Sequence, residues 1–371
     1  MSNILTINAG SSTVRYALFS SAARPRRVLD GKIERLGGDG AAETAQRLLQ
    51  ELQGRGSSAV PDAIGHRVVH GMLHTRPERA SPALLAELRR ITPFDPEHLP
   101  REIALIEEMQ RRFPDVPQVV CFDTAFHQDM PAVAATLPIP RRYAAKGVRR
   151  YGFHGLSYTF LLQELARLGD PAAVKGRVIL AHLGNGASMA AVRDGRCIDT
   201  SMSFTPAAGL VMGTRSGDLD PGLMSYLALA ESMSAARFQT MVNHESGLIG
   251  ISETSADVRD LLERAAGDAR AREALEIFCY QAKKWLGAFA AALGGVDTLV
   301  FAGGIGENSA RLRQDICAGL EYLGIELNDS SNAQNAGRIS TGKVAVRVIR
   351  TDEESVIAEQ TAHALGMAME K

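Results

Sequence analysis

The segment ILTINAGSSTVRYALF, residues 4–19, decides the fold. Its first half is an apolar strand, its centre is a Gly-Ser-Ser turn, and its second half is another strand, so it predicts a β-hairpin. The segment RVILAHLGNGASMAAVR, residues 177–193, repeats this order of strand, glycine turn and strand. The aligned residues are Gly10 with Gly186, Ile7 with Leu183, and Ser12 with Ser188. Chance can produce one such match, so the alignment suggests an internal repeat without proving it.

Strands and helices alternate after each hairpin. Apolar runs predict strands at residues 27–33, 64–69, 118–122, 197–202, 296–302 and 344–349. Helical spacing predicts helices at residues 41–52, 82–112 (interrupted by prolines), 275–293, 308–323 and 353–369, with a polar loop at 330–343. This alternation, present twice, predicts an α/β protein whose central sheets are mixed and flanked by helices.

The length of 371 residues exceeds the size at which a single core stops growing, so two domains are expected. The first should contain residues 1–150 together with the closing helix 353–371. The second should contain residues 151–352 and the later glycine-rich loops.

Composition excludes several classes of protein. The formal net charge is −1, which gives no sign of a nucleic-acid or membrane partner, and the basic stretch 141–150 is best interpreted as a solvated rim. The four cysteines are far apart and form no CxxC pair, so neither a disulfide framework nor a structural zinc site is expected. No signal peptide or spanning apolar run is evident, which predicts a cytoplasmic protein.

Three glycine-rich turns could hold phosphate groups. They are NAGSSTVR (8–15), HLGNGAS (182–188) and FAGGIGENS (301–309). Each could also be an ordinary turn, because Gly, Ser and Asn-Gly are turn formers. Backbone N–H groups and hydroxyls in such turns can surround phosphate oxygens. A P-loop is excluded because GxxxxGK[ST] does not occur.

Taken together, eight motifs resemble those of acetate kinases, within the acetate/propionate kinase group. They are NAGSS, HRVVHG (66–71), FDTAFH (122–127), YGFHG (151–155), HLGNGAS, DTSMSFTP (199–206), MGTRSGDLDP (212–221) and GGIGENS. The resemblance implies the duplicated fold of actin, Hsp70 and sugar kinases, a homodimer, and ATP chemistry that depends on Mg²⁺ or Mn²⁺. It implies transfer of the γ-phosphoryl group of ATP to acetate, or alternatively to propionate, butyrate or a similar short acid.

The resemblance also implies roles for individual residues. The catalytic residues would be Arg67, Asp123, His154 and Arg215. Arg67 would also bind the acid, with Val69, Phe153 and Pro206 around the acyl group. Asn8 and Glu353 would form the metal site. Independently of the resemblance, the spacing Thr351-x-x-Glu354 predicts a capping box, in which Glu354 would pair with Thr351. Nucleotide contacts would come from Asn8, Ser11, Ser12, Arg15, His182, Leu183, Gly184, Asn185, Gly186, Asp257, Val258, Arg259, Gly304, Ile305, Gly306, Glu307 and Asn308.

The chain departs from the family pattern near the predicted acid site. Arg15 replaces a common lysine, Thr13 a serine, Met72 a glycine and Tyr158 a histidine. The usual PLHNP segment reads Pro93-Phe94-Asp95-Pro96-Glu97. The preferred acid is therefore open among short acids.

Three other classes remain as alternatives. A hydroxyl-directed sugar kinase would need a carboxylate base, for which Asp123 is the obvious candidate. An ATP-gated binding module would need a further domain. A metallohydrolase using His66, His70 and His74 would need these residues on a helix, whereas the sequence between them favours a strand.

Overall fold

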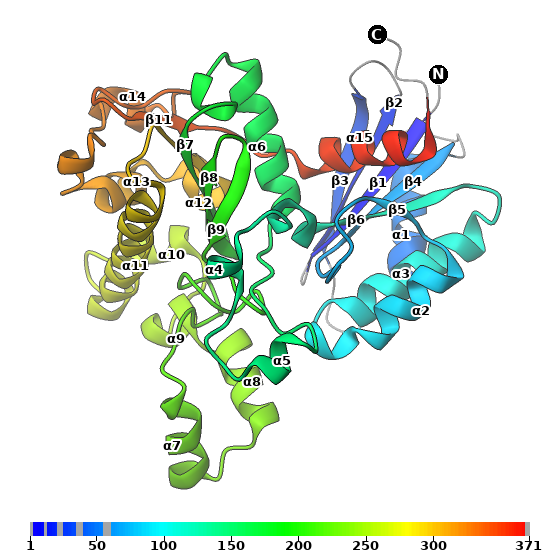
Figure 1. The fold of residues 1–371 in the computed structure, drawn as a ribbon, viewed down its shortest axis with the longest axis horizontal. Helices are drawn as coiled ribbons and strands as arrows, with labels where there is room; N and C mark the ends of the chain where they lie inside the picture. Colours follow the sequence, from blue (N-terminus) through cyan, green and yellow to red (C-terminus); the bar gives the residue numbers. More distant parts are fainter. Residues whose placement is uncertain (1–2, 11–12, 21–24, 35–39, 55–60, 368–371) are drawn as a thin grey trace. The chain divides into compact units, whose positions relative to one another are not determined.

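A computed structural model describes residues 3–10, 13–20, 25–34, 40–54 and 61–367 (Figure 1). The chain divides into two compact units. Unit 1 contains residues 1–128, 153–160 and 352–371, and unit 2 contains residues 129–152 and 161–351. The sequence suggests a boundary near residue 150, whereas residues 129–152 belong to unit 2 and residues 153–160 to unit 1.

Unit 1 is built on a mixed six-stranded sheet with the order β3-β2-β1-β4-β6-β5. Its strands are β1 (Asn3–Ala9), β2 (Thr13–Ser20), β3 (Arg26–Glu34), β4 (Ala63–Val68), β5 (Glu78–Arg79) and β6 (Gln118–Phe122). Its helices are α1 (Ala41–Gly54), α2 (Pro82–Arg90), α3 (Leu99–Arg112) and α15 (Glu353–Leu365), with 3₁₀ turns at Thr92–Phe94 and Asp123–His127.

Unit 2 is built on a mixed five-stranded sheet with the order β11-β10-β7-β8-β9. Its strands are β7 (Arg177–Leu183), β8 (Ala187–Arg193), β9 (Arg196–Thr200), β10 (Thr298–Ala302) and β11 (Ala345–Val348). Its helices are α4 (Ala132–Ala135), α5 (Arg141–Ala144), α7 (Gly222–Glu231), α8 (Ala235–His244), α9 (Gly247–Ser252), α10 (Val258–Arg264), α11 (Ala269–Leu293), α12 (Gly303–Asn308), α13 (Ala310–Cys317) and α14 (Asp329–Ala333). Helix α6 (Gly155–Arg167) begins in unit 1 and ends in unit 2, and 3₁₀ turns span Pro171–Ala173 and Glu321–Leu323.

Apart from the edge strand β5, the two sheets share one topology, which confirms the predicted repeat. In unit 1 the antiparallel strands β3-β2-β1 continue into the parallel strands β4 and β6. In unit 2 the antiparallel strands β9-β8-β7 continue into the parallel strands β10 and β11. Matching the ends of β1 and β7 aligns Gly10 with Gly184 rather than with Gly186. The sequence alignment was therefore wrong by two residues, a slip that the alternation of strand faces cannot reveal because its period is also two.

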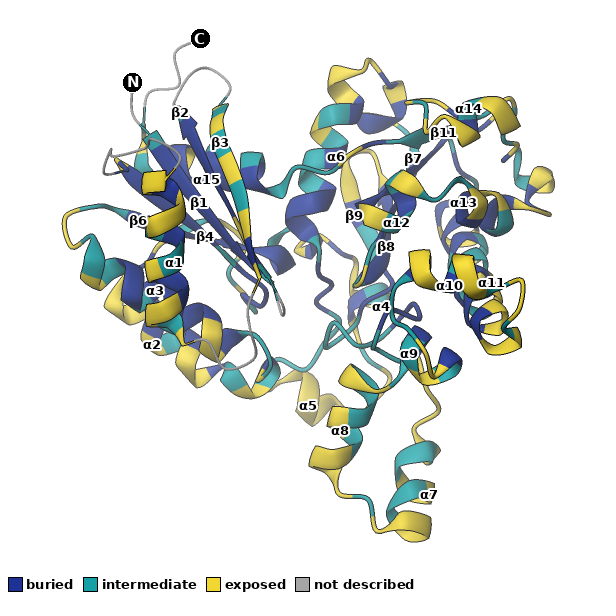
Figure 2. Ribbon diagram, turned by 180° about the vertical axis from the view of Figure 1, so that it is seen from behind, coloured by how far each residue is buried: buried dark blue, intermediate teal, exposed yellow. Residues whose placement is uncertain are grey.

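Each sheet is covered by helices that present apolar faces. In unit 1, Leu48 of α1 and Leu105 of α3 join the cluster that contains Leu5 and Val14. Helix α15 packs on the sheet through Ala358 and Ala362, which are buried with Ile4, Phe19 and Ala63. Figure 2 shows the buried strands of both sheets in dark blue.

In unit 2, α11 repeats apolar residues at helical spacing, and Phe278, Ala282 and Phe289 are buried. Trp285 is only half-buried and packs on Phe289, with ring centroids 5.2 Å apart.

One predicted helix is wrong in its extent. The expected helix at residues 308–323 consists of α12, which already begins at Gly303, a separate α13, and a 3₁₀ turn at Glu321–Leu323. Ser309 separates α12 from α13 and caps the latter, because its side chain accepts the N–H of Leu312. Gly319 follows α13 at φ +81°, a conformation that ends a right-handed helix.

Candidate functional site

Arg67 and Asp123 form a buried ion pair in unit 1. Arg67 lies near the end of β4 and Asp123 directly follows β6, and these strands are parallel neighbours. Asp123 Oδ2 accepts from Arg67 Nε at 3.1 Å and from Nη2 at 2.5 Å, while Nη1 donates to the Ala9 carbonyl at 3.1 Å. Burial alone disfavours the guanidinium charge, but the combined attraction of Asp123, Glu353 and Glu102 outweighs burial and raises the pKa of Arg67 above its ordinary value.

His154 directly precedes α6 and has a left-handed backbone, with φ +58°. Such a conformation is strained for a residue other than glycine and is common at functional sites. The next residue, Gly155, allows the close approach, because a Cβ there would lie 1.9 Å from the backbone oxygen of Asp123. The YGFHG and FDTAFH motifs therefore pack together, and His154 lies next to the segment that carries Asp123.

Asn8 links the first glycine turn to the last helix. It is the second-to-last residue of β1 and lies opposite Arg15 on β2. Its Nδ2 donates to Glu353 Oε2 at 2.8 Å and to Glu354 Oε1 at 3.0 Å. Burial raises the pKa of both carboxyl groups, and for Glu354 the neighbouring Glu353 adds repulsion.

The expected helix cap with Thr351 and Glu354 is wrong. Asp352 is the N-cap of α15, and its Oδ1 accepts the N–H of Ser355 at 3.1 Å. This frees the Glu354 side chain, which is only 8% exposed, to contact Asn8. The contact between Glu354 and Asn8 was missed by the sequence prediction, because the capping-box spacing of Glu354 suggested another use.

The Asn8 cluster fits a divalent cation. Asn8, Glu353 and Glu354 offer amide and carboxylate oxygens, the ligands that Mg²⁺ and Mn²⁺ prefer. Two adjacent carboxyl groups whose pKa values are raised by burial and repulsion gain from a nearby positive charge. Among the described residues there is no group of three or more His, Cys, Asp or Glu side chains arranged for a metal. The proposed ligand set therefore includes the side-chain amide of Asn8 beside the two glutamates.

Two of the three predicted acyl-pocket residues lie in unit 1. Val69 is 3% exposed and Phe153 is 1% exposed. Both carboxyl oxygens of Glu102 accept the Val69 N–H, at 3.1 and 3.3 Å, and burial raises the pKa of Glu102 to about 8. The ring of His70 lies 5.7 Å from the ring of Phe153. Pro206 is half-buried in unit 2.

The departures from the family pattern have local structural effects. Met72 has φ +46°, a left-handed conformation that favours the glycine usual at this position. Tyr158 is fully buried and packs on Phe126 and His127, at ring-centroid distances of 5.5 and 5.9 Å. Asp95 is 3% exposed, and its Oδ1 contacts Nδ1 of His98 at 2.8 Å.

Three predicted motifs meet at the end of β7 in unit 2. The Gly184 N–H donates to the Gly186 carbonyl at 3.1 Å, and the Asn185 carbonyl accepts the Gly213 N–H at 3.0 Å. Gly213 begins the segment that carries Arg215. A Cβ at Gly303 would lie 2.6 Å from the Leu183 oxygen, so the third glycine turn also approaches β7 closely. His182, the second-to-last residue of β7, occupies the position that Asn8 has in β1.

The third glycine turn, which the structure forms as the short helix α12, is held by polar contacts. Glu307 Oε1 accepts the N–H groups of Gly303 at 3.0 Å and of Thr351 at 3.1 Å. Asn308 Nδ2 donates to the Gly304 carbonyl at 2.9 Å. These contacts fix Glu307 and Asn308 in structural bonds, while Gly304 is exposed and Ile305 half-buried.

The segment at residues 257–259 starts α10. Asp257 is its N-cap, and its Oδ1 accepts the Arg259 N–H at 2.9 Å. The Arg259 side chain is 86% exposed and pairs with Asp257, while Val258 is buried. A Cβ at Gly213 would lie 3.3 Å from the Ala256 oxygen, so this segment also borders the β7 turn.

The remaining predicted residues lie as follows. Arg215 is half-buried in unit 2, and its Nη1 lies 3.9 Å from Met212 Sδ. Arg67 and Arg215 thus belong to different units. Ser11 and Ser12 lie outside the described residues.

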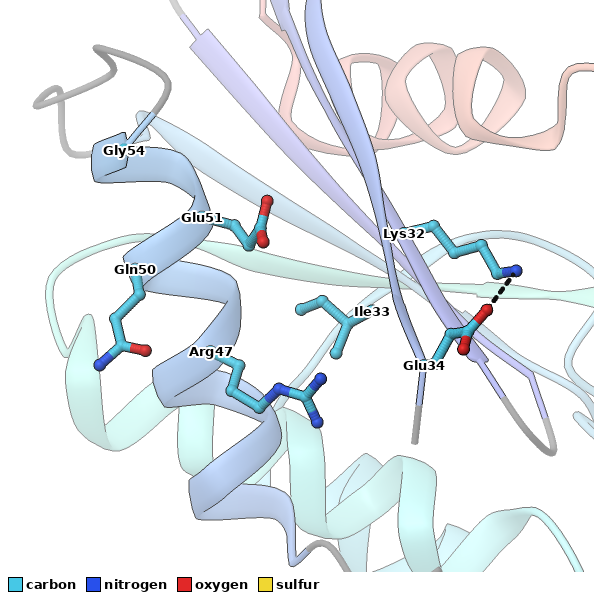
Figure 3. A pocket seen from close by; sticks show the side chains of 7 residues that line it. All are labelled: Lys32, Ile33, Glu34, Arg47, Gln50, Glu51 and Gly54. Atoms are coloured by element: carbon cyan, nitrogen blue, oxygen red, sulfur yellow. Dashed lines mark hydrogen bonds and ion pairs between the residues drawn. The ribbon is translucent and has the colours of Figure 1, made fainter. Parts of the chain in front are cut away.

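A cavity of about 630 Å³ lies elsewhere in unit 1, between β3 and α1 (Figure 3). Its lining carries both signs of charge, from Lys32, Glu34, Arg47 and Glu51. None of the predicted site residues lines it.

The histidines of the metallohydrolase alternative have separate partners. His66, which lies in β4 as the sequence favours, contacts Gln118 Oε1 at 2.8 Å, and His74 contacts Glu78 Oε1 at 2.6 Å. Nothing brings them together as a metal site within the described part of the chain. No helix there is both long and apolar enough to span a membrane.

Comparison with known proteins points to one family. The model of the acetokinase family matches residues 38–359. An acetate kinase of Methylocella silvestris is 42% identical, with 96% of each chain covered. A propionate kinase of Citrobacter rodentium is 39% identical, with 96% of this chain and 95% of the relative covered.

Solved structures extend the agreement to the fold. The acetate kinase of Porphyromonas gingivalis superposes with a TM-score of 0.89 at 35% identity, covering 98% of this chain and 100% of that one. A propionate kinase of Francisella tularensis gives the same values. The two mixed sheets thus form the actin-like fold of these kinases, and the chain belongs to the acetokinase family.

Proposed function

We propose that this chain is a short-chain carboxylate kinase, which transfers the γ-phosphoryl group of ATP directly to acetate or another C2–C4 acid. A carboxylate oxygen forms a bond to the γ-phosphorus as the bond to the β–γ bridging oxygen breaks. The bridging oxygen keeps the electron pair and leaves with ADP. The observation that carries the proposal is the buried Arg67–Asp123 pair next to the Asn8–Glu353 cluster, in a chain of this family.

The reaction needs charge neutralisation rather than proton transfer. A short carboxylic acid is already ionised at neutral pH, so no general base is required. The difficulty is to bring two anions together and to stabilise the charge on the transferring phosphoryl group. A guanidinium has five N–H donors. Arg67 donates three hydrogen bonds to Asp123 and Ala9, so its remaining N–H groups are suited to binding an anion.

Each catalytic residue then has a defined role. Asp123 orients the Arg67 fork rather than accepting a proton. His154 and Arg215 donate to the oxygens of the transferring phosphoryl group. Val69, Phe153 and Pro206 surround the acyl chain.

We assign nucleotide binding to the turns of unit 2. His182, Leu183, Gly184, Asn185 and Gly186 supply one turn. The other contacts come from Asp257, Val258, Arg259, Gly304, Ile305, Gly306, Glu307 and Asn308. Asn8, Ser11, Ser12 and Arg15 complete the set from unit 1.

Asn8 and Glu353 would hold a divalent cation, Mg²⁺ or Mn²⁺, and we add Glu354 to this pair. The ion supplies positive charge that neutralises phosphate oxygens. The residues themselves keep the cluster rigid, because Asn8 Nδ2 contacts both carboxyl groups.

The proposed acceptor is a short-chain acid, and the proposal covers chain lengths from C2 to C4. Relatives that resemble the chain almost equally are an acetate kinase and a propionate kinase, at 42% and 39% identity. An apolar pocket separates acids that differ by one methylene by only about 1–3 kcal/mol. A sugar-kinase activity has less support, because Asp123 is committed to Arg67.

We further propose a homodimer that works in the cytoplasm, where ATP is available. The second copy would bind the hairpin of α7 and α8 (residues 222–244). Neither helix contains a buried residue, and Tyr226 and Leu229 are 65% and 88% exposed (Figure 2). Exposed apolar side chains on a projecting hairpin are typical of a protein interface.

Hydroxylamine trapping of acyl phosphate tests the proposed activity. Purified protein is incubated with ATP, Mg²⁺ and, in separate reactions, acetate, propionate, butyrate or glucose. Hydroxamate should form with at least one of the acids, and no glucose phosphate should appear. Absence of hydroxamate with every C2–C4 acid, or phosphorylation of glucose alone, would reject the proposal.

A further inference from the structure

Arg313 is a fully buried arginine directly behind the third glycine turn of unit 2. It lies on α13 and has no exposed surface. Its Nη1 donates to the Gly306 carbonyl at 2.8 Å, and its Nε donates to Asn332 Oδ1 at 2.8 Å. Nη2 donates to the Asn332 carbonyl at 2.8 Å and to Asn335 Oδ1 at 2.6 Å. The guanidinium therefore ties the glycine turn to the segment around α14.

All of these partners are neutral. Four carbonyl and amide oxygens satisfy the hydrogen bonds, but no carboxylate pairs with Arg313 among the residues that the structure describes. Burial lowers the pKa of Arg313, yet a guanidinium stays protonated in proteins. Arg67, in contrast, is paired with Asp123. Arg313 is thus a permanent positive charge without a countercharge within the described part of the chain.

A buried charge of this kind is costly unless an opposite charge approaches. The Gly306 carbonyl, which Arg313 contacts, belongs to the turn that also borders β7: a Cβ at Gly303 would lie 2.6 Å from the Leu183 oxygen. An anion bound at this turn would feel the guanidinium through protein of low dielectric constant, where salt screens little.

We propose that Arg313 is a positioning residue. Its positive charge, which no carboxylate neutralises among the described residues, makes this turn bind a nucleotide that carries negatively charged phosphates more tightly than an uncharged nucleoside. This inference rests on the proposed function, because it requires that the turn binds the nucleotide. It adds an electrostatic basis for selecting ATP and ADP over uncharged nucleosides. The hydrogen bond to Gly306 keeps the charge and the turn in one geometry.

Asn335→Asp tests the charge without removing a bond. The new carboxylate can still accept from Nη2, and Asp tolerates the left-handed backbone of Asn335, whose φ is +51°. The substitution gives Arg313 a countercharge. Gln334→Glu is the matched control, since it introduces the same charge at the adjacent exposed position without contacting Arg313.

The measurement is calorimetric binding of ATP, ADP and adenosine to the full chain at fixed Mg²⁺. For Asn335→Asp, the Kd of ATP and ADP should rise about tenfold, as expected for one charge acting through protein, while that of adenosine stays unchanged. Gln334→Glu should bind all three as the wild type does. Melting temperatures without nucleotide establish that both variants fold.

The other outcomes separate the two proposals. Wild-type affinities of Asn335→Asp for all three ligands, or an equal loss for ATP and adenosine, would overturn the role of the charge. A control variant that weakens ATP as much as Asn335→Asp would do the same. Absence of nucleotide binding by the wild type would instead reject the proposed function.

Discussion

The Arg67 guanidinium and the carboxyl groups around it influence one another electrostatically. Asp123 contacts Arg67 directly, and the charges of Glu102 and Glu353 also act on the pKa of Arg67. Burial raises the pKa of Glu102 to about 8 and also raises the pKa of Glu353, so burial disfavours the negative charge of both carboxyl groups. This balance suits a site that must admit an anionic acid.

Glu102 gives this balance a measurable pH dependence. Its pKa of about 8 lies above the value of 4.5 for an unfolded chain, so the native state holds the extra proton. The stabilisation from this group is complete below pH 4.5 and is lost as the pH rises to about 8. Glu102→Gln mimics the neutral form. In urea unfolding, the variant should gain stability relative to wild type from pH 5 to pH 8, by at most about 5 kcal/mol. A difference between the two proteins that stays constant with pH would contradict this assignment.

Arg215 should be needed for turnover but not for nucleotide affinity. Arg215→Ala removes a donor assigned to the transferring phosphoryl group, so kcat should fall by at least about 100-fold. The Kd of ATP, measured by calorimetry, should stay near the wild-type value. Arg311→Ala is the control, because Arg311 is exposed and pairs only with Asp315 among the described residues. Turnover of Arg215→Ala at the wild-type rate would refute its role.

At the scale of elements, glycines allow helices to pack closely against neighbouring segments. Gly155 is the first residue of α6 and faces the backbone oxygen of Asp123. Gly65 plays a similar part in β4, because a Cβ there would lie 2.2 Å from Oγ1 of Thr361 in α15. Both glycines are required for packing rather than for a turn.

Gly155→Ala should therefore destabilise the protein although alanine is the better helix former. The added methyl group meets a backbone atom, which cannot move easily, so the free energy of unfolding should fall by about 1–3 kcal/mol. Gly287→Ala, in the interior of α11, has no atom within 4 Å of the new Cβ and should stabilise by about 0.5–1 kcal/mol. Urea unfolding compares the two. Equal effects of both changes would show that the contact with Asp123 does not govern this position.

Most elements could be predicted from local sequence. The run at residues 118–122 is the strand β6 with the predicted bounds, and the predicted hairpin at residues 177–193 consists of β7 and β8. Apolar runs between turn residues specify such buried strands. The prediction of one helix at 308–323 was wrong because cap and glycine signals at Ser309 and Gly319 outweighed its periodicity.

Candidate site residues could be predicted only where motifs contained them. Arg67, Asp123 and Asn8 were predicted in this way, and the structure shows their contacts with buried groups. Glu102 and Arg313 were missed because their contacts join residues far apart in the sequence or involve backbone oxygens. A lone buried Glu or Arg on an amphipathic helix leaves no local pattern.

For the whole molecule, the duplicated sheet explains why two glycine turns occupy equivalent places. Asn8 and His182 are each the second-to-last residue of the strand that enters such a turn. One fold thus supplies two related turns, which have diverged to an amide with two glutamates in unit 1 and to a turn bordered by glycine motifs in unit 2.

The exposed α7–α8 hairpin should mediate dimer formation. Leu229→Glu places a charge at a residue that is 88% exposed, so it should shift the protein from dimer to monomer without unfolding it. Sedimentation velocity gives the mass of each species. Val133→Glu, at another exposed apolar residue (90%), should leave the dimer intact. A monomeric wild type, or a dimer of unchanged affinity in Leu229→Glu, would exclude this surface.

The central claim is that a carboxylate oxygen attacks the γ-phosphorus of ATP. The most direct test uses acetate or propionate labelled with ¹⁸O in the carboxyl group and follows the product by ³¹P NMR. We expect an acyl phosphate whose phosphorus signal shows the isotope shift of one directly bonded ¹⁸O, contributed by the acid. A phosphorylated product without ¹⁸O on phosphorus, or no acyl phosphate from any C2–C4 acid, would contradict the account.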